Sequence, residues 1–246
     1  MRLASEQLGV RVVAGVDGCK AGWFAVWGDG GETWDFDVFP DFTTLWQALN
    51  EATLILVDIP IGMPFAAPRR CDIEARRRLG HPRGSSVFPA PCREALSAES
   101  HAEASAINRK VLGKGITRQC WGICPKIRQV DDLLRSDKEA RGIVREGHPE
   151  VAFWTFAGVP MACKKSTAMG VQERLGVLRV RWSAVDDLLI RATRRYSRTE
   201  VGRDDIVDAV AMYLTAASSA CAIRTIPDLP DRDRLGQPME MVFAGR

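Results

Sequence analysis

RVVAGVD at residues 11–17 and TLILVDI at residues 53–59 are two short apolar stretches that each carry an aspartate at or near the end. The unbroken Leu-Ile-Leu-Val of the second stretch is typical of a central parallel strand that is buried on both faces. If the two stretches are parallel neighbours, their carboxyl ends bring Asp17 and Asp58 together at the edge where open α/β sheets bind ligands.

Between these two stretches the pattern predicts two further strands and a helix. Residues 22–28 (GWFAVWG) form one strand candidate, and residues 33–39 (TWDFDVF) alternate as a half-exposed strand does. Glycine-containing turns separate them, which favours an antiparallel meander. A helix fits residues 42–51. Three strands, a helix and another buried strand are typical of the start of an α/β fold.

The rest of the chain is predicted to complete one domain over residues 1–246. We expect residues 60–147 to form a helical and loop insertion after the fourth strand. It includes charged helical stretches around residues 70–79 and 126–141 and a loop with the sequence SSVFPAPCREAL. The sequence EVAFWTF at residues 150–156 has strand character and would supply a fifth strand to a mixed sheet. Three helices follow at residues 167–179, 183–196 and 203–222, and residues 224–246 read as an extended tail.

Composition sets only broad limits on function. The chain has 246 residues, 46% of them hydrophobic, and its formal net charge is only +3. That balance neither indicates nor excludes nucleic-acid binding. The N-terminus lacks the apolar segment of a signal peptide, and no apolar run approaches the roughly 20 residues of a membrane span. The seven cysteines are scattered along the chain, and we expect them to be reduced thiols. We therefore expect a cytoplasmic protein.

The acidic residues predict a metal site. Two carboxylates at the end of an apolar core cannot both ionise cheaply unless something compensates their charge. A divalent cation does so, and hard cations prefer oxygen ligands. The alternative is that Asp17 or Asp58 only caps a turn. Two such acids at equivalent strand ends favour the functional interpretation.

The last predicted helix adds a second acidic group. Asp205 and Asp208 are three residues apart and share one face of the helix. Acids in a first helical turn often only complement the helix dipole, and we assign Asp204 to that role. Asp208 lies one turn further in, where the dipole argument weakens, so we expect it to act as a metal ligand.

Further along the chain, Glu150 follows His148 and Pro149 and is a candidate third or fourth ligand. His148 could pass a proton, although a lone histidine beside a proline is more often structural. Two pairs of basic residues could bind phosphate oxygens, or they could simply be solvated charges on the surface. The candidate substrate-binding residues are Lys126, Arg128, Lys164 and Lys165.

Six motifs together resemble an uncharacterised bacterial and archaeal family of predicted nucleases with a ribonuclease H-like fold. Their joint order is more specific than any one of them, and they extend from about residue 12 to the C-terminal tail. The motifs are GVDGCKAGW at 15–23, VDIPIGMP at 57–64, SSVFPAPCREAL at 85–96, CPKIRQVDD at 124–132, HPEVAFW at 148–154 and DDIVDAVA at 204–211.

The resemblance implies a ribonuclease H-like mixed five-stranded sheet and a catalytic set of acids. Asp17 and Asp58 match the acids of the first and fourth strands. DDIVDAVA is similar to the last helix of Holliday-junction resolvases, which points to Asp205 and Asp208. The family's HPE segment falls on Glu150. Two Mg²⁺ or Mn²⁺ ions would then support hydrolysis of a phosphodiester, in a nucleic acid or another substrate.

Two other functions compete with the nuclease. Actin-like kinases and ATPases share the strand meander and an aspartate after the first strand, but this chain is short for a two-lobed kinase. A non-catalytic nucleic-acid-binding or assembly module could retain the fold, although unneeded buried acids cost stability. Metal binding would separate the nuclease from the module, and nucleotide binding without cleavage would favour the kinase-like enzyme. Oligomeric state is left open.

Overall fold

The computed structural model describes residues 11–218 and 223–245. Its centre is a mixed five-stranded sheet in the order β3-β2-β1-β4-β5, which confirms the predicted α/β class and is consistent with a ribonuclease H-like arrangement. The strands are β1 (Val13–Cys19), β2 (Gly22–Gly28), β3 (Trp34–Phe39), β4 (Leu54–Val57) and β5 (Val144–Glu146). β1 to β3 form an antiparallel meander, whereas β4 pairs in parallel with β1 and with β5.

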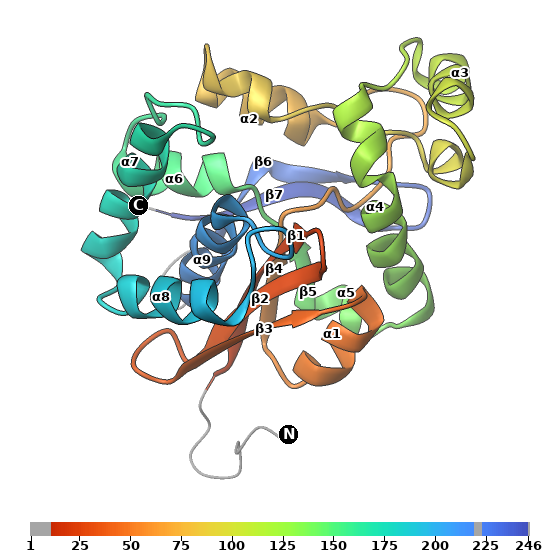
Figure 1. Ribbon diagram of the computed structural model, residues 1–246. Coiled ribbons are helices and arrows are strands. Elements are labelled where there is room, and N and C mark those ends of the chain that lie inside the picture. Colours follow the sequence, from red (N-terminus) through yellow and green to blue (C-terminus); the bar gives the residue numbers. More distant parts are fainter. Residues whose placement is uncertain (1–10, 219–222, 246) are drawn as a thin grey trace.

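Helices cover both faces of this sheet (Figure 1). One apolar core joins alternate side chains of β1, β2 and β4 to α6 (Pro149–Ala157), α7 (Ala168–Arg181), α8 (Val185–Arg195) and α9 (Arg203–Ala217). The remaining strand side chains pack on α1 (Phe42–Leu49) and α4 (Arg118–Ser136) on the other face. Since β1 and β4 are sandwiched between two helical layers, their side chains are buried almost without alternation, as the apolar sequence predicted.

The fifth strand is not where the sequence predicted it. Residues 150–156 form helix α6, not a strand, and β5 comprises only Val144–Glu146 at the end of the predicted insertion. Pro149 stands at the first helical position, and His148 Nδ1 caps the helix by accepting from the Glu150 N–H at 3.2 Å. A short apolar run that is buried nearly all round looks the same in a helix and in a strand, which explains the error.

The segment between β4 and β5 is mostly helical. Its elements are α2 (Arg70–Leu79), η1 (Arg83–Ser86), η2 (Arg93–Ser97), α3 (His101–Leu112), α4 and α5 (Ala140–Ile143). Helix α2 has the predicted bounds, whereas α4 begins eight residues before the charged stretch expected at residues 126–141. Among the described residues, no helix is both long and apolar enough to cross a bilayer.

The tail is more ordered than an extended wrap. Its two strands, β6 (Ile223–Arg232) and β7 (Pro238–Ala244), form an antiparallel hairpin that packs on α2 and α6 in a third apolar cluster. A parallel bridge between Gly147 and Val242 connects the hairpin to the end of β5. The helix predicted over residues 203–222 is α9, which ends at Ala217, and positions 219–222 lie outside the described residues.

Candidate metal centre

Two aspartates lie side by side at the carboxyl ends of β1 and β4. Parallel pairing places Val16 opposite Val57, and the backbone N–H of Asp58 donates to the Val16 carbonyl at 3.0 Å. Asp17 and Asp58 therefore occupy equivalent positions on neighbouring strands, as the sequence predicted. The Gly18 N–H donates to Asp17 Oδ1 at 2.7 Å and orients that carboxylate.

Helix α9 brings a third aspartate to the same edge. A Cβ at Gly15 would lie 1.9 Å from the Tyr213 nitrogen and 2.4 Å from the Ala209 carbonyl oxygen, so only glycine lets β1 touch the α9 backbone. This close approach places Asp208 over the strand ends. Carboxylate oxygens of Asp17, Asp58 and Asp208 lie within 4.8 Å of one another. Three oxygen donors at this spacing can hold a divalent cation.

Burial and mutual repulsion make the three carboxylates costly to ionise. Burial raises the pKa of Asp17 well above its usual range, and the charges of Asp58 and Asp208 raise it further. Burial also raises the pKa of Asp58, and it raises that of Asp208 to about 7. A bound cation would reverse this penalty, because it favours the ionised form of every carboxylate that it touches.

Lys165 is the principal positive charge at the cluster. Its Nζ lies 2.7 Å from Asp208 Oδ2, and the acids Asp208 and Asp17 raise the pKa of Lys165 against the opposing effect of burial. Nearly half of the lysine side chain is exposed. The loop between α6 and α7 therefore supplies a cation that reaches the acids from the solvent side.

Glu150 stands next to the cluster with one oxygen unused. Its charge raises the pKa of both Asp58 and Asp208, and its side chain is paired with the buried Arg174. Glu150 Oε2 is buried and has no hydrogen-bond partner among the described residues. An orphaned carboxylate oxygen beside three aspartates fits a site for a hard cation. The residues present therefore fit one or more Mg²⁺ or Mn²⁺ ions.

The other predicted site residues lie at different distances from the cluster. Asp205 Oδ2 accepts the Gly202 N–H at 2.8 Å at the start of α9, and its pKa rises to about 6, chiefly through burial. Its charge still raises the pKa of Asp17, so it lies within electrostatic reach without belonging to the three-carboxylate group. Asp205 thus has a structural contact at the N-terminus of α9, where we had predicted that only Asp204 acts structurally, by complementing the helix dipole.

Of the predicted basic residues, Lys126 joins Lys165 near the acids, and the other two are exposed. Lys126 Nζ donates to the Gly22 carbonyl and lies 4.6 Å from the centre of the Trp23 ring. Burial lowers its pKa, while Asp17 and Asp205 oppose that effect. Arg128 and Lys164 have exposed side chains. The carbonyl of Lys164 instead accepts from Thr167 at the start of α7.

A second buried ionic group ends the neighbouring strand and was missed from the sequence. Glu146, the last residue of β5, pairs with Arg69, which also pairs with Asp72. All three are at least 97% buried. The only sequence signal was the i, i+3 spacing of Arg69 and Asp72, because the three-residue strand β5 shows no periodicity.

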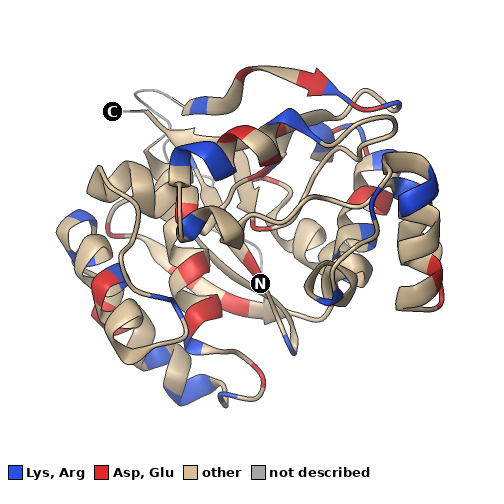
Figure 2. Ribbon diagram, turned by 90° about the horizontal axis from the view of Figure 1, so that it is seen from above, with Lys and Arg blue, Asp and Glu red and all other residues tan. Residues whose placement is uncertain are grey.

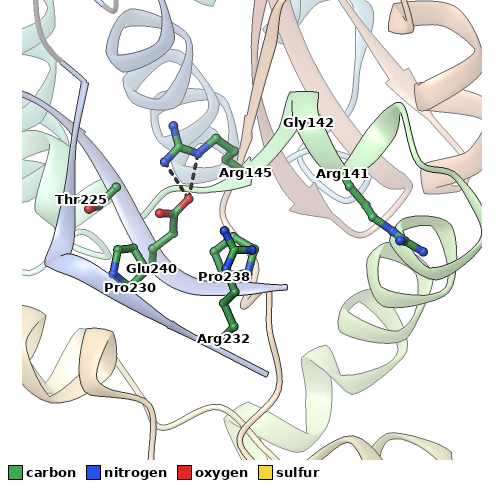
Figure 3. Close-up of a pocket in the computed structure, with 8 residues that line it drawn as sticks. All are labelled: Arg141, Gly142, Arg145, Thr225, Pro230, Arg232, Pro238 and Glu240. Atoms are coloured by element: carbon green, nitrogen blue, oxygen red, sulfur yellow. Dashed lines mark hydrogen bonds and ion pairs between the residues drawn. The ribbon is translucent and has the colours of Figure 1, made fainter. Parts of the chain in front are cut away.

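A pocket between β5 and the β6–β7 hairpin lies away from the acidic cluster. Figure 3 shows its arginines, and the Arg145 guanidinium there is paired with Glu240, with 2.7 Å between Nη2 and Oε1. Seen from above (Figure 2), acidic and basic residues are interspersed over the helices, as the small net charge implies. The acidic cluster is thus a local feature rather than part of a charged face.

Comparison with known proteins adds a family but no activity. The model of a family described as "Protein of unknown function (DUF429)" matches residues 15–232, which include Asp17, Asp58 and Asp208. Neither the curated proteins nor the solved structures give a significant match.

Proposed function

The chain belongs to the DUF429 family, whose function is unknown, and we propose that it is a divalent-metal-dependent nuclease that hydrolyses phosphodiester bonds. The observation that carries the proposal is the convergence of Asp17, Asp58 and Asp208 within 4.8 Å at the carboxyl edge of the sheet. A strand order consistent with a ribonuclease H-like arrangement supports it, although a fold by itself does not determine an activity.

Asp17, Asp58 and Asp208 would hold the Mg²⁺ or Mn²⁺, with Glu150 Oε2 as a further oxygen donor. When bound, the metal supplies Lewis acidity for a water nucleophile and for the leaving oxygen. Since the acids lie at the ends of two hydrogen-bonded strands and on a helix that touches β1, their positions are fixed before substrate arrives. That rigidity is what electrostatic catalysis requires.

The basic residues at the site would bind the substrate. Lys165 reaches the acids from an exposed loop and can exchange its contact with Asp208 for a phosphate oxygen. Lys126 lies on α4, which covers the face of the sheet opposite to the one covered by α6 and α7, the helices that flank Lys165. His148 Nδ1 accepts the Glu150 N–H, so Nε2 is the ring nitrogen that can donate a hydrogen bond.

Cleavage assays test this proposal. Labelled single- and double-stranded DNA and RNA are incubated with the protein and Mg²⁺ or Mn²⁺. We expect cleavage of at least one substrate, and a loss of at least about 100-fold in the Asp17→Asn and Asp58→Asn variants. Asp204→Asn is the matched control, because Asp204 lies on the same helix as Asp208 but outside the acidic group. Equal activity in the wild type and in Asp17→Asn would contradict the proposal.

A further inference from the structure

Arg83 is a buried arginine without a carboxylate partner among the described residues. It lies in η1, and its side chain and backbone together are only 6% exposed. The one hydrogen bond of its side chain to the described part of the chain runs from Nη1 to the Cys163 carbonyl at 3.3 Å. Its Nε is buried and has no partner there.

Arg174 converges on the same carbonyl. From α7 its Nη1 donates to Cys163 at 3.1 Å, and its Nη2 donates to Glu150. The Nε of Arg174 is likewise buried without a partner. Arg83 Nε, Arg174 Nε and Glu150 Oε2 are the three unsatisfied buried side-chain atoms of the described residues, so all of them gather in one part of the molecule.

The two arginines differ in their ionic partners. Arg174 is paired with the Glu150 carboxylate, whereas Arg83 forms no ion pair with a described residue. The nearby Glu173 carboxylate accepts instead from the backbone N–H groups of Ala162 and Cys163, at 2.7 and 2.9 Å. A buried charge without a counter-ion is expensive, and buried polar groups of native proteins nearly always have a partner.

Other arginines with low exposure are neutralised inside the protein. Arg69 binds Asp72 and Glu146, Arg93 binds Asp131 and Asp233, and Arg145 in the pocket of Figure 3 binds Glu240. Arg83 differs from all of these, because the only described group that its side chain contacts by a hydrogen bond is a backbone carbonyl. A guanidinium kept in this state is suited to an anion that arrives from outside.

Arg83 and Arg174 adjoin the acidic cluster. Cys163 is two residues before Lys165, whose Nζ binds Asp208, and Glu150 links Arg174 to the electrostatics of Asp58 and Asp208. A polyanionic substrate at the acids would therefore pass close to the loop that Arg83 and Arg174 hold.

We propose that Arg83, with Arg174, forms a phosphate-binding subsite beside the acidic cluster. The identification of this phosphate as one that flanks the scissile bond of a nucleic acid rests on the proposed nuclease function. Arginine fits the role because its planar donors match two oxygens of a phosphate at once. Cleavage would then need a phosphate next to the one attacked, in addition to the metal.

Thermal unfolding with inorganic phosphate as the probe tests the subsite in the metal-free, full-length protein. We expect phosphate to raise the Tm of the wild type in a saturable manner, because a ligand that binds only the folded state stabilises it. Arg83→Met should show no such rise. Without phosphate it should melt at or above the wild-type temperature, because an unpaired buried charge has been removed. Arg194→Met, which removes an exposed arginine of α8 that belongs to no proposed site, should respond to phosphate as the wild type does.

Arg83→Lys keeps the charge but loses the planar fork, so we expect it to fold and to bind phosphate at least about tenfold more weakly. Wild-type phosphate binding by Arg83→Met or Arg83→Lys would overturn the proposal. So would an Arg83→Met protein that melts well below the wild type without phosphate, because the arginine would then be a structural element.

The subsite and the nuclease can fail separately. Asp17→Asn should lose cleavage but keep the phosphate response, since Asp17 does not contact either arginine. A phosphate response that depends on Arg83 in a protein without nuclease activity would refute only the proposed function. Cleavage by a protein whose Tm phosphate does not change would refute only the subsite.

Discussion

The carboxyl edge of the sheet carries two buried acidic groups that differ in how their charge is balanced. At the end of β5, Glu146 and Asp72 share the guanidinium of Arg69, and backbone N–H groups of Ile61 and Ala90 donate to the same carboxylates. At the ends of β1 and β4, three aspartates share one half-exposed lysine.

This difference distinguishes an ionic group that only stabilises the fold from a group that could bind a ligand. In the Arg69 group each carboxylate has a guanidinium partner and a backbone N–H donor, and these contacts connect segments that are far apart in the sequence. Burial raises the pKa of Glu146 to about 7, but the charge and hydrogen bonds of Arg69 oppose that rise. In the aspartate cluster burial raises the pKa values of all three acids, and neighbouring aspartates raise those of Asp17 and Asp208 further. Strained charges of this kind are expected where a ligand supplies the missing charge.

The largest effect is expected from breaking the complete group. Arg69→Met leaves Glu146 and Asp72 buried without their counter-ion and should destabilise the protein by about 3–5 kcal/mol. Urea unfolding measures the change. Arg70→Met, at the adjacent exposed position, should stay within about 0.5 kcal/mol of the wild type. A similarly small effect of Arg69→Met would show that the two groups do not differ as described.

Next in size is the pH dependence of the metal-free protein. The pKa of Asp208 rises from 3.8 to about 7 on folding, so between these values the folded state binds more protons than the unfolded state. The stability of the wild type relative to Asp208→Asn should therefore fall as pH rises from about 4 to 7, by on the order of 2 kcal/mol. Urea unfolding of both proteins across this range measures it. A relative stability that rises with pH would contradict the assigned shift.

Matched amide substitutions should have opposite signs in the two groups. Glu146→Gln disrupts a satisfied ion pair and should destabilise the protein by about 1–3 kcal/mol. Asp58→Asn relieves repulsion and should stabilise the metal-free protein at pH 8 by about 1 kcal/mol. The two are compared by urea unfolding in chelator. If both substitutions destabilise equally, the aspartate cluster is as complete as its neighbour.

The smallest effect is expected from removing the charge of Lys165. Lys165→Met removes a charge that competes for Asp208, so Mn²⁺ should bind about fivefold more tightly, near 1 kcal/mol. Lys164→Met, one residue away and exposed, should leave the affinity unchanged. Calorimetric titration compares the three proteins. Weaker Mn²⁺ binding by Lys165→Met would mean that the lysine supports the metal site rather than competing for it.

The sequence was sufficient to predict the site residues that lie at strand ends or on one face of a helix. Continuous apolar runs identified β1 and β4 as buried parallel strands, which was enough to bring Asp17 and Asp58 together. The three-residue spacing of Asp205 and Asp208 placed both acids on one face. In the structure Asp208 lies with the two strand aspartates, and Asp205 accepts the Gly202 N–H at the start of the helix.

The sequence could not supply features that long-range packing creates. β5 is too short to show a period, so a buried helix was read as the fifth strand. Arg69 and Glu146 are 77 residues apart, and Arg83 reaches a carbonyl 80 residues away. Such pairs leave no local pattern. An arginine that is buried without a counter-ion looks the same in a sequence as one on the surface.

The most direct test of the central claim is calorimetric titration of Mn²⁺ into the wild type and into the Asp17→Asn/Asp58→Asn double variant. If the aspartate cluster is a metal site, the wild type binds Mn²⁺ and the folded double variant does not. A folded wild-type protein that binds no Mn²⁺ would contradict the account.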